Sequence, residues 1–150
     1  MSEIEQYVIF SLNEQIYGIE ILKIKEVVSY QKITPLPNMR GFIRGIINLR
    51  GVILPVFDLR EKFNLPETTY TPFNSIMVME ISGRVMGVIV DEISDVVELF
   101  PEEVQAASSL PPGVRAEYIK GIGKKERELI VLLDVDRLLS SEELEILDAT

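Results

Sequence analysis

The stretch that decides the fold is Gly41–Leu59, with the sequence GFIRGIINLRGVILPVFDL. Two apolar runs flank a polar turn at Asn48–Gly51, and Gly51 can adopt the positive φ that tight two-residue turns require. The pattern therefore predicts a β-hairpin whose tip carries Arg50.

A degenerate copy of this hairpin follows later in the chain, starting at Tyr118. The spacing between the glycine and the closing aspartate is the same in Gly45–Asp58 as in Gly121–Asp134. The copy keeps the apolar runs but replaces the Asn-Leu-Arg-Gly turn with Lys124–Arg127. Because loops on a shared scaffold often carry function, the first turn is a candidate functional site.

Composition restricts the classes of protein that the chain can form. Its 150 residues fit one domain, and a formal net charge of −9 disfavours nucleic acid as a partner. The chain has no cysteine and no histidine, which removes disulfides and the commonest acid–base group and metal ligand. No apolar stretch reaches the roughly 20 residues of a membrane span, and no signal-peptide pattern is present. We expect a soluble cytoplasmic protein without catalytic, cofactor-binding or metal-binding residues.

Two further hairpins are expected from β-forming runs that flank short polar turns at Asn13-Glu14 and Ser82-Gly83. Each is followed by a segment with mixed, partly helix-like spacing of its apolar residues. The hairpin runs are Tyr7–Leu12 with Gln15–Ile19, and Ile76–Ile81 with Arg84–Val90.

The repetition of these segments predicts an internal duplication. Gly18 aligns with Gly87, and the segments that follow align without a gap. We expect repeat units at about 6–63 and 75–139, joined by a linker at Leu65–Asn74. Units of this size made of short strands predict a mainly β protein with two small barrel-like lobes packed together. The sequence leaves open whether each lobe is contiguous or the lobes exchange strands.

The C-terminal region predicts a short helix over about 140–148. Ser140–Glu143 has the pattern of a capping box. Leu144, Ile146 and Leu147 are expected to dock this helix on the core.

Three groups of polar residues could carry chemistry, and each has a simpler structural interpretation. Gly121–Lys125 is a weak match to a phosphate loop, and a turn before a hairpin is favoured. Asp58, Asp134 and Asp136 could bind a hard cation, but aspartates at strand ends favour a structural role. The acidic residues of Asp91–Asp95 are typical of a solvated face.

Arg50 and a set of apolar residues favour a binding role. Arg50 is either an exposed turn cation paired with Asp58 or Glu26, or a guanidinium that a partner carboxylate or backbone can bind bidentately. Hydrophobic residues form 47% of the chain, so some apolar side chains either fill a core between the lobes or line a partly exposed groove for protein partners. The candidates are Ile24, Val27, Val28, Ile43, Ile46 and Val90.

From about residue 6 to the terminal helix, the chain resembles the CheW family of bacterial chemotaxis coupling proteins. The resemblance rests on Tyr17–Val27, Gly45–Leu59 with its Asn-Leu-Arg-Gly turn, Gly87–Asp91 and the Tyr118–Leu139 block. It implies two five-stranded SH3-like β-barrels packed together, with short helices. It also implies a role without chemistry.

In that role, the family couples the cytoplasmic tip of methyl-accepting chemoreceptors to the regulatory domain of the CheA histidine kinase, in arrays at the membrane. That domain is itself CheW-like, so one barrel of each protein would pack on one of the other. The coupling surface of the family falls on Ile24, Glu26, Gly45 and Arg50, with Asn48 and Gly51 shaping the turn. Physical grounds alone extend it to Val27, Val28, Ile43 and Val90.

Two alternatives remain at this point. The chain could be a CheW-like fragment of a larger chemotaxis kinase or fusion protein, although a starting Met1 and a capped terminal helix favour a free-standing protein. It could also be a small β-barrel enzyme or ligand binder, which the lack of histidine and cysteine disfavours. A strong hit in a thermal-shift screen of metabolites would support that second alternative.

Overall fold

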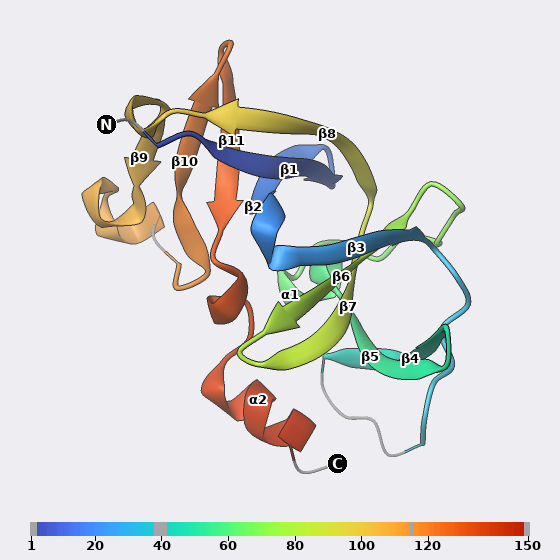
Figure 1. Cartoon of the computed structure of the whole chain (residues 1–150). Coiled ribbons are helices and arrows are strands. Elements are labelled where there is room, and N and C mark those ends of the chain that lie inside the picture. Colours follow the sequence, from blue (N-terminus) through green and yellow to red (C-terminus); the bar gives the residue numbers. More distant parts are fainter. Residues whose placement is uncertain (1–2, 38–41, 115, 149–150) are drawn as a thin grey trace.

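The computed structural model describes residues 3–37, 42–114 and 116–148, and it is mainly β (Figure 1). The strands are β1 (Glu5–Leu12), β2 (Gln15–Glu20), β3 (Ile24–Ser29), β4 (Ile43–Leu49), β5 (Val52–Asp58), β6 (Ser75–Ile81), β7 (Arg84–Val90), β8 (Glu92–Leu99), β9 (Val104–Ala106), β10 (Ile119–Lys125) and β11 (Glu128–Leu133). The helical elements are α1 (Leu59–Lys62), α2 (Ser141–Asp148) and the 3₁₀ turns η1 (Ile21–Lys23), η2 (Pro101–Glu103), η3 (Ala107–Ser109), η4 (Pro112–Val114) and η5 (Val135–Arg137).

The strands form two sheets, which lie in the upper and lower parts of Figure 1. One has the order β8-β1-β2-β11-β10-β9, and the other has the order β3-β6-β7-β5-β4. The prediction of a mainly β protein with few helices, one of them C-terminal, is confirmed. The two sheets are consistent with SH3-like barrels.

Each sheet takes strands from both halves of the chain. The first sheet combines β1 and β2 with strands β8 to β11, and the second combines β3, β4 and β5 with β6 and β7. When each strand is matched to its predicted repeat equivalent, five strands follow the same order in both sheets. The two lobes therefore exchange strands, which the sequence had left open.

The registers of the two sheets also correspond. Each has one parallel pair, which places Leu132 opposite Gly18 in one sheet and Val56 opposite Gly87 in the other. The β4–β5 and β10–β11 hairpins each have a bulge just before the glycine, Gly45 or Gly121. These matching irregularities support the duplication, and the unit limits of 6–63 and 75–139 stay a prediction.

In the described part of the chain, four two-residue turns connect antiparallel hairpins, including the three that the sequence predicted. Both turn residues have positive φ in every case, which matches the right-handed twist of the strands they join. The φ values are 51° and 69° at Asn13-Glu14, 52° and 89° at Arg50-Gly51, 49° and 85° at Ser82-Gly83, and 47° and 74° at Glu126-Arg127.

Several local expectations are corrected. The segments after the Asn13-Glu14 and Ser82-Gly83 hairpins have partly helix-like spacing, but apart from the single turn η1 they form β3 and β8, which are strands at the edges of their sheets. Gly121–Lys125 lies within strand β10 and forms neither a turn nor a phosphate loop. The Leu65–Asn74 linker has no regular structure, but Leu65 packs against the core and Tyr70 is held by hydrogen bonding.

The largest apolar cluster joins the two sheets, because it includes Phe10 from β1, Phe57 from β5 and Leu133 from β11. Leu144 and Leu147 of α2 pack against this cluster, whereas Ile146 is exposed, contrary to expectation. None of the helices in the described part of the chain is long and apolar enough to cross a membrane.

The predicted capping box of α2 is confirmed. The Glu143 backbone N–H donates to Ser140 Oγ at 3.1 Å, and the Ser140 N–H donates to Glu143 Oε1 at 2.8 Å. These reciprocal bonds satisfy two N–H groups that the helix start would otherwise leave unpaired.

At Gly45, the segment that contains Thr34 passes very close to the backbone of β4, and a substitution can test this contact. A Cβ atom at Gly45 would lie 2.4 Å from the backbone oxygen of Thr34, whereas one at Gly113 would meet nothing within 4 Å. Gly45→Ala should therefore lower the free energy of unfolding by about 1–3 kcal/mol, as overpacking does. Gly113→Ala is the control for urea denaturation, and equal stability of the two variants would contradict this packing.

Candidate functional site

The tip of the β4–β5 hairpin is held by its own side chains. The Gly51 N–H donates to Asn48 Oδ1 at 2.8 Å, which closes the turn as the sequence predicted. Arg50 has a φ of 52°, so a non-glycine residue occupies the left-handed region in the hairpin turn, and 69% of its side chain is exposed. The turn therefore presents the Arg50 side chain in a defined direction.

Glu26 of β3 holds that side chain. Arg50 Nη2 donates to Glu26 Oε1, and the interaction raises the pKa of the guanidinium. Of the two ion-pair partners considered from sequence, the structure has Glu26, while Asp58 accepts the Arg60 N–H at 2.8 Å and caps α1. The pair is exposed, so it orients Arg50 more than it stabilises the fold.

Exposed apolar residues follow each member of the pair along the chain, on β3 and β5. Val27 of β3 is 45% exposed, and Val52 and Ile53 of β5 are 57% and 55% exposed. We call Glu26, Val27, Arg50, Val52 and Ile53 the hairpin-tip surface. An apolar area with a fixed charged pair is typical of surfaces that bind other proteins.

The equivalent tip of the β10–β11 hairpin has the same backbone and different chemistry. Glu126 and Arg127 occupy its turn, and Leu129, at the position equivalent to Ile53, is 64% exposed. Lys125 folds back to donate to the backbone oxygen of Glu98 at 2.8 Å. Within the described residues, an Arg–Glu pair like Arg50 and Glu26 is therefore found at the β4–β5 tip and not at the β10–β11 tip.

The structure separates the other predicted site residues. Ile24 and Val28 point inward from β3 and pack, partly buried, against two different apolar clusters. Val90 is 1% exposed and belongs to the central core, so its assignment to a partner-facing groove is wrong. Ile43 is 7% exposed and is also a core residue, although it borders a hollow beside β4. Gly45 has a structural role, because only a residue without a side chain lets the Thr34 backbone pass so closely over it.

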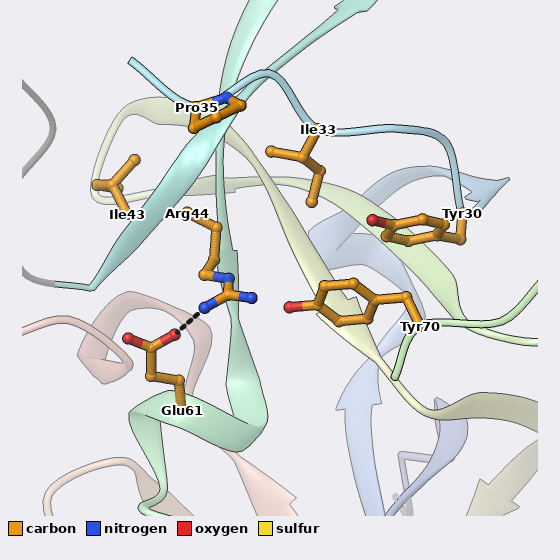
Figure 2. Close-up of a pocket in the computed structure, with 7 residues that line it drawn as sticks. All are labelled: Tyr30, Ile33, Pro35, Ile43, Arg44, Glu61 and Tyr70. Atoms are coloured by element: carbon orange, nitrogen blue, oxygen red, sulfur yellow. Dashed lines mark hydrogen bonds and ion pairs between the residues drawn. The ribbon is translucent and has the colours of Figure 1, made fainter. Parts of the chain in front are cut away.

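That hollow lies between β4, α1 and the segments that carry two tyrosines, and its volume is about 450 Å³ (Figure 2). Tyr30 and Tyr70 form one wall, with ring centroids 4.8 Å apart and planes inclined at 26°. Ile33 and Pro35 form the roof in Figure 2. We call this the Tyr30–Tyr70 hollow.

Polar contacts fix the walls of the hollow. Tyr70 donates its hydroxyl to Asp58 Oδ2 at 2.6 Å, and burial together with this bond raises the pKa of the phenol. The guanidinium of Arg44 lies 5.6 Å from the centre of the Tyr70 ring and pairs with Glu61 at 3.4 Å. The hollow is therefore a preformed aromatic surface.

A partly buried ion pair ties the two sheets together near this region. Arg60 of α1 donates to both oxygens of Asp91 at 2.6 and 2.7 Å, and to the Pro66 carbonyl at 2.6 Å. Asp91 also accepts the Asn13 N–H of the β1–β2 turn at 2.8 Å. The expectation of a solvated face at Asp91 is wrong, because this carboxylate lies where the halves of the chain meet.

Sequence reasoning missed the Tyr30–Tyr70 hollow and the exposed Phe73. The hollow has no local signal, since its two tyrosines lie forty residues apart. Phe73 does have one, because it is a lone aromatic residue within the polar Leu65–Asn74 segment.

The chain was compared with known proteins. A family model described as the CheW-like domain matches residues 6–143. The chain is 38% identical over 144 residues to chemotaxis protein CheW of Klebsiella aerogenes, covering 96% of this chain and 87% of that protein. It is 34% identical over 144 residues to chemotaxis protein CheW of Treponema pallidum, covering 93% and 85%.

A solved structure has the same fold. The scaffolding protein CheW of Thermoanaerobacter tengcongensis superposes with a TM-score of 0.83 at 31% identity, covering 94% of this chain and 97% of that one. Two exchanged β-sheets with an exposed, charge-bearing hairpin tip define a mainly β scaffold with a candidate protein-docking surface. The chain belongs to the CheW-like family of chemotaxis adaptor and scaffold proteins.

The burial of Val90 can be tested by making the same substitution at Val90 and at Val27, which is exposed as predicted. Val90→Asp places a carboxylate in the core and should lower the free energy of unfolding by more than about 3 kcal/mol. Val27→Asp on the exposed face of β3 should cost about 1 kcal/mol or less. Chemical denaturation of both variants measures this, and similar losses would mean that Val27 is also a core residue.

Proposed function

We propose that this protein is a non-catalytic adaptor that couples the cytoplasmic tip of methyl-accepting chemoreceptors to the CheA histidine kinase. It does so in the cytoplasm, at receptor arrays beside the membrane. Membership of the CheW-like family supports the adaptor role. The observation that carries the proposal is Arg50, which Glu26 holds beside exposed Val52 and Ile53.

The hairpin-tip surface is suited to a partner with an apolar centre and a carboxylate at its rim. Val52 and Ile53 supply apolar area that gains free energy when a partner removes it from water. Arg50 supplies donors in a fixed direction, which gives specificity as well as affinity. The regulatory domain of CheA is the partner we assign to this surface.

The partly buried face of β3 serves a different purpose in the proposal. Ile24 and Val28 pack inward from β3, the strand that also carries Glu26. We assign them a positioning role, while Val27 contacts the partner directly.

Arg50→Glu tests the proposal. It should weaken co-sedimentation with CheA and receptor fragments about tenfold or more, as loss of an interface hot spot does. Circular dichroism should show an unchanged fold, since Arg50 is exposed. Arg127→Glu is the matched control, because Arg127 is a turn cation at the equivalent tip and the charge change is the same.

The double exchange Glu26→Arg with Arg50→Glu separates two explanations. If the ion pair only rigidifies the turn, the exchange restores the pair and with it complex formation. If Arg50 binds a partner carboxylate, as we propose, the exchange stays defective. Wild-type assembly by a folded Arg50→Glu variant would overturn the proposal.

A further inference from the structure

The C-terminal helix α2 makes a connection between the two lobes that is separate from the strand exchange. The chain enters α2 from β11 of the first sheet through η5, but α2 lies beside the lower, second sheet in Figure 1. Lys62 of α1 donates to Glu143 Oε1 at 2.5 Å. At the other end of the helix, Arg84 of β7 donates to both carboxylate oxygens of Asp148, through Nε at 2.7 Å and through Nη2. Both cations belong to the second lobe, so α2 fastens the end of the chain across the boundary between the lobes.

The attachment of α2 is shallow. All eight residues of the helix are at least partly exposed, and its apolar anchors, Leu144 and Leu147, are only partly buried against the largest apolar cluster. The segment before the helix is different, because Leu138 and Leu139 are 0% and 4% exposed. Local opening of α2 therefore leaves the buried side chains of the core in place.

The helix and its docking depend on the same groups. Glu143 Oε1 accepts the Ser140 N–H of the capping box at 2.8 Å, and it also accepts the Lys62 ammonium. Asp148 lies at the C-terminal end, where the helix dipole disfavours a carboxylate unless a cation such as Arg84 pairs with it. Eight residues are also fewer than the roughly 12–15 that an isolated helix needs in water. Helix formation and docking should therefore occur together.

We propose that α2 is a releasable clasp between the lobes, which is helical when docked on Lys62 and Arg84 and which detaches and unfolds as one unit while both sheets stay folded. Because ion pairs hold both ends of the helix, dissolved salt shifts the balance towards the released state. Release exposes two cations of the second lobe that the docked helix neutralises. The clasp uses no residue of the hairpin-tip surface, and the inference does not depend on the proposed function.

Hydrogen exchange of individual amides, measured by NMR on the full chain, tests the clasp. Lys62→Gln and Arg84→Gln leave the sequence of α2 intact, so a self-sufficient helix would keep its protection in both variants. The clasp predicts that the amides of residues 144–148 exchange about three- to tenfold faster in each variant. They should also exchange faster in the wild type when NaCl is raised from about 0.05 to about 1 M. The matched control is Arg137→Gln, which removes a cation from an exposed pair with Asp134 just before α2 and should leave the exchange unchanged.

The pattern along the helix distinguishes a clasp from simple fraying. Release as a unit gives one common factor from Leu144 to Asp148, while the amides of β11 stay protected. An acceleration that declines from Asp148 towards Leu144 would mean that only the end frays, and it would overturn the proposal. So would unchanged exchange across α2 in either variant, the same acceleration in Arg137→Gln, or an equal acceleration in β11, which would show global unfolding.

Discussion

The two parallel strand pairs, β2 with β11 and β5 with β7, hold the rest of the structure together. Each joins segments from opposite halves of the chain, and glycine stands at the contact in both. A Cβ atom at Gly18 would lie 3.1 Å from Leu132, and one at Gly87 would lie 2.9 Å from Ile76 and 3.2 Å from Val56. Because neither half can complete a sheet without the other, folding of the two lobes should be cooperative.

This exchange produces a body suited to a scaffold. The largest apolar cluster spans both sheets, and the Arg60–Asp91 pair links α1 to the β1–β2 turn. The two lobes are thus fastened both by apolar packing and by a partly buried ion pair, which holds surfaces on either lobe at a fixed separation. The tips of the β4–β5 and β10–β11 hairpins have the same backbone conformation but present different side chains.

Local signals in the sequence were sufficient for the hairpins and for the capped helix. Two-residue turns such as Asn13-Glu14 and Ser82-Gly83 between β-forming runs have a short-range cause, and so has the Ser140–Glu143 capping box. The turn chemistry of Asn48 and Gly51 was within reach for the same reason. The choice of Glu26 over Asp58 as the partner of Arg50 was not, because Glu26 lies on a separate strand, β3.

The strand exchange and the hollow could not be predicted, since contacts between distant segments leave no local pattern. Val90 was misassigned because a continuous apolar run such as Val85–Val90 does not reveal which residues face the core. Asp91 was misassigned because its partner, Arg60, lies in the other half of the chain.

The central claim is that function resides at the first hairpin tip and not at its structural equivalent. The chain contains no cysteine, so single cysteines at Ile53 and Leu129 can report on each tip. Thiol alkylation rates would be measured with and without the regulatory domain of CheA. The account predicts that the domain protects Ile53→Cys and leaves Leu129→Cys reactive. Equal protection of both positions, or protection of Leu129→Cys alone, would contradict it.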